Sequence, residues 1–360
     1  MSSQPSLKKF GTDLFKALNT GISYFLPVII GGGFLFAIAI GTGTVTDKGI
    51  IASNEFFRVV LTIGTSGFAM MVPVLCGYIA YAIAGKPALA PGLILGYVVN
   101  NPIGDAKYQT GFIGAMIVGI IVGYFTKWMK TWKLPAPVMT VMPLMIMPTI
   151  TSLVIGAFYA YVLAYPLVQL TELLKAILNS MNTYGAGALG IAIGIMAAID
   201  MGGPASKAAT GFTLALMDVG SFAPNGAFRL CCAVPPLGLA LATFIGARFF
   251  SEEERKMGIS AFFLSMAGIT EGAIPFAVKD FKHVLPSICI GTAIAGALGM
   301  MHNITNIVAF GGLAALPAVT DGKLWYVVDM FIGAFIVAGL MIFFRFREQQ
   351  KQKKEEAAKA

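Results

Sequence analysis

The amino-acid sequence predicts an all-α integral membrane protein with about ten transmembrane helices and re-entrant hairpin segments. Two observations carry this prediction. Of the 360 residues, 57% are hydrophobic and only 12% are charged, whereas charged residues make up about a quarter of soluble domains. Apolar stretches also recur along the whole chain, many of them near the roughly 20 residues that a helix needs to cross a hydrocarbon core.

The apolar runs define the candidate spans. The first run, residues 18–40, follows a basic segment without a small-residue cleavage site, so we predict a retained helix and not a removed signal peptide. Runs 258–269 and 307–316 are short and have Gly or Pro at their edges, so we predict re-entrant segments that line a protein cavity. The other candidate spans are residues 59–84, 89–99, 111–125, 139–163, 185–199, 205–217, 227–249, 284–301 and 325–344.

Lysines and arginines near the ends of the spans predict the orientation. The positive-inside rule places their four clusters, and with them both termini, in the cytoplasm. The expected organisation is a cytoplasmic segment 1–17, a transmembrane permease domain 18–345 and a cytoplasmic tail 346–360, with an amphipathic interface helix at 166–183. The net charge of +8 follows this pattern and does not indicate nucleic-acid binding. The clusters are Lys8, Lys9 and Lys16; Lys127, Lys130 and Lys133; Arg248, Arg255 and Lys256; and Arg345 with the residues after it.

The small residues and cysteines in the apolar runs indicate helix packing and not a catalytic or metal site. GIIVG (119–123) and GIAIG (190–194) have the small-xxx-small spacing of closely packed membrane helices. The four cysteines have no metal-ligand spacing, so we expect buried free thiols and neither a metal nor a cofactor. These cysteines are Cys76, Cys231, Cys232 and Cys289.

The segment AAIDMGGPASKAATGF contains the first polar group inside an apolar context, where each charge costs about 2.5 to 3.5 kcal/mol on insertion scales. Asp200 ends an apolar run, Gly202 and Gly203 break the helix, and Pro204 suits the first turn of the next helix. We predict a half-helix whose N-terminal amides face a polar cavity, with Lys207 one turn further on. The alternative is an Asp200–Lys207 ion pair at a tight turn on the membrane surface.

The segment MAGITEGAIPF carries the second such group. A short apolar run leads to Glu271 at a break formed by Gly272 and Pro275. A carboxylate there can accept hydrogen bonds from two neighbouring sugar hydroxyls, or a proton from a hydroxyl that is being phosphorylated. The alternative is a carboxylate that reaches water or pairs with Lys279 or Lys282.

Two further polar segments are weaker candidates. In GYVVNNPIGDAKYQTGF, Asn101 lies with Asp105 and Lys107 in a turn between apolar runs, and an ordinary loop outside the membrane explains this pattern better than a binding site does. His302 is one of two histidines and begins HNITN before a predicted re-entrant segment. It could bring an imidazole to a cavity, or could be a hydrogen-bonded histidine at a helix end.

Five ordered sequence blocks resemble the enzyme IIC component of the bacterial sugar phosphotransferase system, fructose family. The resemblance runs from about residue 21 to residue 344 and implies a homodimeric sugar translocator with about ten helices and re-entrant hairpins. It implies that Glu271 is the sugar ligand beside the phosphorylated position, and that Asp200, Gly202, Gly203, Pro204 and Lys207 line the cavity. The blocks are GKPALAPGLILGY, GFIGAMIVGIIVGY, IDMGGPASKAA, VPPLGLALAT and GITEGAIPFA.

The resemblance also implies the partners. The chain has neither of the system's phosphoryl-carrier domains, so we expect IIA and the phosphocysteine protein IIB to be separate polypeptides, supplied in turn by HPr and enzyme I. IIB would dock on the basic cytoplasmic loops of this multi-pass protein of the bacterial inner membrane. Alone, the chain would bind and slowly carry a fructose-like sugar but phosphorylate nothing. In members of the family an Asn commonly stands at the position of Ser206, and the NNPIGDAKYQT turn is closer to fructose-like paralogues.

The residues alone leave rival functions open. An ion-coupled secondary transporter would use Asp200 and Glu271 to carry protons. A membrane-embedded enzyme would need a fuller catalytic set, and a passive channel would need no IIB. The expected group-translocation mechanism needs no ion gradient, because phosphorylation traps the sugar inside.

Overall fold

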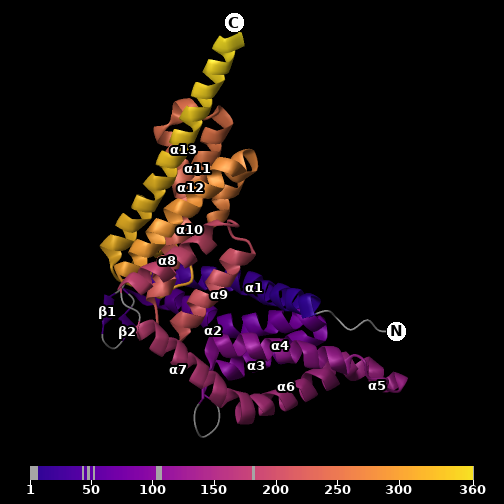
Figure 1. The fold of residues 1–360 in the computed structure, drawn as a ribbon. Helices are drawn as coiled ribbons and strands as arrows, with labels where there is room; N and C mark the ends of the chain where they lie inside the picture. Colours follow the sequence, from indigo (N-terminus) through magenta and orange to yellow (C-terminus); the bar gives the residue numbers. More distant parts are fainter. Residues whose placement is uncertain are drawn as a thin grey trace. The chain divides into compact units, whose positions relative to one another are not determined.

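A computed structural model describes residues 7–42, 44–46, 49–51, 53–102, 108–180 and 183–359. The described chain is almost entirely helical and forms two compact units. Unit 1 contains the described residues up to 39 and from 53 to 179, and unit 2 contains those from 40 to 51 and from 180 onward. Figure 1 shows the helices coloured along the sequence.

Unit 1 is built from apolar helices that approach one another through glycines. A Cβ on Gly119 would lie 2.8 Å from the carbonyl oxygen of Cys76, and one on Gly123 would lie 2.7 Å from Cβ of Ile83. The GIIVG pair therefore brings α4 against α2, as its spacing predicts. The elements are α1 (Leu7–Thr42), α2 (Glu55–Ala84), α3 (Lys86–Val99), α4 (Gly111–Met129), α5 (Ala136–Val141), η1 (Met142–Ile146), α6 (Met147–Phe158), η2 (Tyr159–Leu163) and α7 (Ala164–Ser180).

Unit 2 is organised around α10, which is the most buried of its membrane-length helices. A second glycine pair brings α8 against α12, since a Cβ on Gly190 would lie 2.1 Å from the carbonyl oxygen of Gly296. The elements are β1 (Thr44–Thr46) and β2 (Gly49–Ile51), which pair antiparallel; α8 (Thr183–Ala198), α9 (Pro204–Asp218), α10 (Ala223–Ile245), η3 (Ala247–Phe249), α11 (Glu252–Met266), η4 (Thr270–Ala273), α12 (Ile274–Met301), β3 (Thr305–Asn306), η5 (Leu313–Ala318), β4 (Val319–Asp321) and α13 (Lys323–Lys359).

Residues 252–280 begin and end beside the same residue of unit 2, Arg345. Arg345 of α13 contacts both ends of this segment, with its Nη2 2.8 Å from Oε1 of Glu254 and 3.4 Å from Oδ2 of Asp280. Glu253 and Lys279 form a second ion pair between the same two ends. Between them the chain follows α11 outward, turns through η4 and comes back to a non-helical residue, Asp280, inside α12. We call residues 252–280 the hairpin; its tip is η4.

Residues 303–318 form a mostly non-helical segment that packs on the tip of the hairpin. A Cβ on Gly312 would lie 2.3 Å from the carbonyl oxygens of Ser265 and Met266, so the two backbones touch. Asn225 of α10 donates hydrogen bonds to the carbonyls of Asn306 and Val308, both at 2.8 Å. Buried side chains thus satisfy backbone groups that no helix satisfies, which irregular chain at membrane depth requires.

The helices agree with the predicted spans in position, although their number differs. Among the described residues, seven helices are long and apolar enough to cross a membrane, and the shorter apolar helices are Lys86–Val99 and Tyr184–Ala198. The predicted total of about ten crossings and the membrane topology of the hairpin therefore stay predictions. The domain boundaries at residues 17/18 and 345/346 also stay predictions; both fall inside helices, α1 and α13.

Candidate functional site

The turn between α8 and α9 is held by the carboxylate of Asp200. Met201 and Gly202 have φ angles of 48° and 100°, which turn the chain sharply after α8. Asp200 then folds back over the start of α9, where its carboxylate accepts hydrogen bonds from the backbone N–H groups of Ala205 and Ser206. A carboxylate in this place satisfies free amides and complements the helix dipole.

Lys207 does not neutralise this carboxylate. It is half-buried one turn into α9 and, among the side chains that the structure describes, forms no ion pair with Asp200 or any other acid. The Asp200–Lys207 pair that the sequence left as an alternative is therefore not formed, because the amides of α9 already occupy Asp200.

Glu271 lies against this same turn. A Cβ placed on Gly202 would come within 2.6 Å of Oε1 of Glu271, so the carboxylate packs directly against this glycine. Gly203 has a similar role toward Asp200, since a Cβ there would lie 2.9 Å from its Cγ. The structure thus brings together the GGP turn and the ITEG break, whose contacting residues, Gly202 and Glu271, are 69 positions apart.

The carboxylate of Glu271 is available for a ligand. Its side chain is exposed at the hairpin tip and makes no ion pair within the described part of the chain. Lys279, which the sequence offered as its partner, pairs with Glu253 at the other end of the hairpin. A free carboxylate on a short irregular turn can accept hydrogen bonds from neighbouring hydroxyl groups.

Helix α10 forms the wall behind the hairpin tip. A Cβ on Gly272 would lie 3.0 Å from Cβ of Pro236, and Cys232 lies beside Thr270 and within electrostatic range of Glu271. Pro235 and Pro236 have no N–H, so the carbonyl groups one turn earlier in α10 lack helical donors. The tip therefore carries an exposed carboxylate beside the proline-containing part of α10.

His302 lies elsewhere, at the C-terminal end of α12. Its Nδ1 is 2.8 Å from Oδ2 of the buried Asp329, and its ring stacks on Trp325 with centroids 4.1 Å apart. No hydrogen bond or ion pair joins His302 to Glu271 or Asp200 within the described residues. This is the hydrogen-bonded histidine at a helix end that the sequence left as the alternative to a cavity ligand.

Asn101 belongs to unit 1, whereas the other candidate residues belong to unit 2. It follows the end of α3 and donates a hydrogen bond from Nδ2 to the carbonyl of Tyr97 at 2.8 Å. Asp105 and Lys107 of the same turn lie outside the described residues. The local contacts of Asn101 are those of a helix-ending loop residue, and its assignment to a binding site stays a prediction.

Three charged residues of unit 2 have surroundings that the sequence did not predict. Arg229 and Asp329 are 5% and 0% exposed inside α10 and α13, and Arg345 joins the two ends of the hairpin. Arg229 and Asp329 interrupt the apolar runs 227–249 and 325–344, so the rule that singled out Glu271 would have found both. The role of Arg345 depends on contacts with residues 65 and 91 positions away, which sequence spacing does not indicate.

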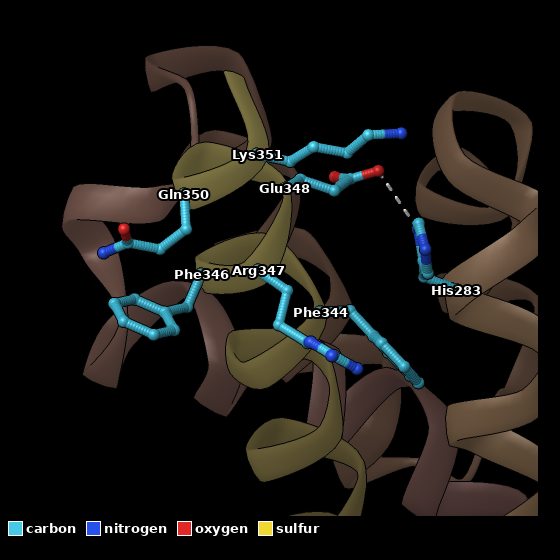
Figure 2. Close-up of a pocket in the computed structure, with 7 residues that line it drawn as sticks. All are labelled: His283, Phe344, Phe346, Arg347, Glu348, Gln350 and Lys351. Atoms are coloured by element: carbon cyan, nitrogen blue, oxygen red, sulfur yellow. Dashed lines mark ion pairs between the residues drawn. The ribbon is translucent and has the colours of Figure 1, made fainter. Parts of the chain in front are cut away.

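An open hollow of about 650 Å³ lies at the far end of α13. Figure 2 shows Arg347, Glu348 and Lys351 around it, with Glu348 reaching toward His283, whose Nδ1 is 3.6 Å from Oε1 of Glu348. Asp280 completes this group at 2.8 Å from the same nitrogen. Because Arg345 already contacts Asp280, we interpret the group as an ion-pair network at the hairpin base and not as a metal site.

The fold and the site define a class: a multi-pass, all-helical membrane protein that holds a free carboxylate on an irregular turn within a helical unit. The family model described as "Phosphotransferase system, EIIC" matches residues 19–291. The chain belongs to this family, and it is a sugar permease subunit of a phosphotransferase system. The comparisons do not favour the ion-coupled secondary transporter.

Curated relatives support the same assignment over most of the chain. The "Fructose-like permease IIC component 2" of Escherichia coli K12 is 35% identical over 89% of this chain and 88% of its own length. The "PTS system fructose-specific EIIC component" of Haloferax volcanii is 31% identical over 93% of each chain. The "PTS system fructose-specific EIIABC component" of Bacillus subtilis is 34% identical over 91% of this chain, which spans about half (51%) of that relative. No solved structure matches this chain.

Proposed function

We propose that this chain binds fructose or a fructose-like sugar at Glu271 and presents it to a separate phosphorylated IIB protein. The observation that carries this proposal is the free carboxylate of Glu271 at the hairpin tip, packed against Gly202. Relatives whose names specify fructose support the class of sugar. Two oxygens of one carboxylate can accept hydrogen bonds from adjacent hydroxyl groups and so fix one face of a sugar.

The start of α9 is the second element of the proposed site. Asp200 holds the Gly202–Gly203 turn in the shape that admits Glu271, so we assign it a positioning role. Lys207, one turn further on, supplies an uncompensated cation. In this proposal Asp200 shapes the site, Lys207 contributes charge, and Glu271 contacts the sugar.

Phosphoryl transfer follows directly from this arrangement. A sugar hydroxyl attacks the phosphorus of phosphocysteine on IIB, the P–S bond breaks as the new O–P bond forms, and the thiolate stays on IIB. Glu271 accepts the proton that the hydroxyl loses. The products are a sugar phosphate and dephosphorylated IIB, and no ion gradient is consumed.

The partners and the setting are part of the proposal. The fused relative from Bacillus subtilis is named as an EIIABC protein, which supports a functional association of this chain with IIA and IIB and, through them, with HPr and enzyme I. We propose a homodimer in the bacterial inner membrane with both termini cytoplasmic. In this topology the hairpin is re-entrant, and its base at Arg345 faces the cytoplasm.

Glu271→Gln tests the proposed sugar ligand. The neutral amide keeps the shape but loses the charged acceptor, worth about 1.5 to 3 kcal/mol per hydrogen bond, so sugar affinity should fall at least about tenfold. Binding of labelled fructose to the purified full chain measures this loss. Glu252→Gln is the matched control, since Glu252 forms only an exposed pair with Lys256 and should bind sugar as the wild type does. Unchanged affinity in Glu271→Gln would refute the role of Glu271.

A further inference from the structure

The guanidinium group of Arg229 is a buried charge without a counter-ion. Arg229 is 5% exposed inside α10, and Nη2 has no hydrogen-bond partner. Its Nε donates to Oδ1 of Asn225 at 3.1 Å, and this neutral amide is its only hydrogen-bond acceptor among the described residues. No carboxylate pairs with it within the part of the chain that the structure describes.

Burial of an unpaired charge lowers the stability of the fold, so the position of Arg229 needs a physical explanation. An arginine is always protonated, so it cannot escape burial by losing its proton. Removal from water without an opposite charge destabilises a folded protein, and intramembrane charges accordingly mark substrate pathways or pair with one another. Since the described residues supply no carboxylate here, a ligand is the source of the opposite charge that we consider.

Arg229 lies where the hairpin tip meets the segment 303–318. A Cβ on Gly311 would be 2.1 Å from the carbonyl oxygen of Arg229, and a Cβ on Gly268 would be 2.5 Å from the carbonyl carbon of Gly311. Cys232, one turn further along α10, lies within electrostatic range of both Arg229 and Glu271. Arg229 is therefore close behind the turn that carries Glu271, without forming an ion pair with it.

We propose that Arg229 binds the phosphoryl group during its transfer to the sugar and the phosphate of the sugar phosphate product. The inference rests on the function proposed above, in which a phosphoryl group passes from the IIB cysteine to a hydroxyl held by Glu271. A phosphoryl dianion beside a carboxylate needs a nearby cation, and a guanidinium matches phosphate oxygens with two parallel N–H donors. Lys207 has less need of this role because it is only half-buried and water can solvate it.

Access to Arg229 depends on the conformation of the tip. Nη2 is sealed from solvent in this arrangement, so the phosphoryl group reaches it only after the hairpin tip or the segment 303–318 shifts. Both segments meet through glycine backbones, which contribute no side chains that would have to be displaced. Free sugar, which carries no charge, gains little from Arg229, and the effect is confined to the phosphorylated species.

The test compares Arg229→Met with Arg229→Lys in the purified full chain. Two quantities are measured: binding of labelled fructose, and the single-turnover rate of label transfer from phospho-IIB to fructose. Arg229→Met should keep fructose binding and lose transfer by about 100-fold or more, the usual effect of one lost transition-state donor. Arg229→Lys retains the positive charge but lacks the two parallel N–H donors of the guanidinium group. It should therefore recover part of the transfer rate. Arg58→Met is the control, because Arg58 is exposed, pairs with Glu55 on the first turn of α2 and lies outside the basic cytoplasmic clusters; this variant should resemble the wild type.

Thermal stability gives an independent readout. Fructose 1-phosphate and fructose 6-phosphate serve as probes, and at least one should raise the melting temperature of the wild type more than fructose does. This difference should vanish in Arg229→Met, whose own melting temperature should not fall, since an unpaired buried charge has been removed. Transfer at the wild-type rate, or equal losses of fructose binding and transfer in both variants, would overturn the inference. Failure of the wild type to receive label from phospho-IIB would instead refute the proposed function.

Discussion

Glu271 and Asp200 are both carboxylates at breaks in apolar helices, yet their surroundings give them different roles. The oxygens of Asp200 accept hydrogen bonds from the backbone of α9, so this group is occupied in holding a turn. Glu271 is exposed and has no ion pair within the described residues. The difference in partners, and not residue type, is the reason why we propose Glu271 as the ligand-binding group.

Gly202→Ala should damage the site without unfolding the protein. The added methyl would meet Oε1 of Glu271 at 2.6 Å and would be held at a φ of 100°, a conformation that costs a non-glycine residue about 1 to 3 kcal/mol. That strain lowers stability, whereas displacement of the Glu271 carboxylate removes a charged hydrogen bond to the sugar, worth about 1.5 to 3 kcal/mol, so fructose affinity should fall roughly 10-fold or more. Gly339→Ala, which meets no atom within 4 Å, is the control. Equal fructose binding by the two variants would show that Gly202 has no part in shaping the site.

At the scale of single residues, the sequence predicts the features that depend on neighbouring residues in the chain. A lone carboxylate between an apolar run and a Gly-Pro break predicts an unusual position for Glu271, and the pattern Asp-x-Gly-Gly-Pro predicts the turn at Asp200. Pairings between distant residues leave no such pattern: His302 meets Asp329 27 positions away. The sequence did not show which acids lie near Lys207 and Lys279; in the structure, Lys279 pairs with Glu253.

At the scale of elements, the hairpin determines where Glu271 lies. Its two ends meet at Arg345 and at the Glu253–Lys279 pair, while α11 between them rises about 21 Å for its fifteen residues. The returning leg is shorter, because only nine positions separate Glu271 from Asp280, so Glu271 lies at most about 15 Å from the hairpin base. The hairpin tip packs against small residues. These are Pro235 and Pro236 of α10, and Gly311 and Gly312 of the segment 303–318.

Cysteine labelling tests whether the hairpin is re-entrant. In a Cys289→Ser background, the remaining native cysteines are buried, so Glu253→Cys and Lys279→Cys should report on the two ends. Both should react with a membrane-impermeant maleimide from the cytoplasmic side only. Leu324→Cys, at the exposed start of α13, should react only from the other side. Labelling of positions 253 and 279 from opposite sides would mean that the segment crosses the membrane.

The sequence predicts the elements better than their connections. Apolar runs locate the helices because lipid and protein interiors both demand apolar faces, and the small-xxx-small pairs identify two close helix contacts. The apolar runs do not show whether a segment crosses the membrane or turns back within it, since run 258–269 would be equally apolar in either case. Only the ion pairs at Arg345 and Lys279 relate the two ends of the hairpin.

At the scale of the whole molecule, the depth of the site bears on the mechanism. IIB is expected to be a cytosolic protein that docks on the cytoplasmic side, and the carboxylate of Glu271 lies up to about 15 Å beyond the hairpin base. The sugar must therefore move toward the cytoplasm before transfer, and the two compact units supply bodies that can move as wholes. Unit 2 contains Glu271, Asp200 and Lys207 together, so the site would travel intact.

Transfer of label from phospho-IIB to sugar tests the central claim most directly. Purified full chain in lipid vesicles is mixed with ³²P-labelled phospho-IIB and fructose, with an uncoupler present to remove any proton gradient. We predict labelled sugar phosphate with the wild type, and none without the chain or with Glu271→Gln. Absence of sugar phosphate with fructose and related sugars, together with fructose uptake that the uncoupler abolishes, would contradict the account and indicate an ion-coupled transporter.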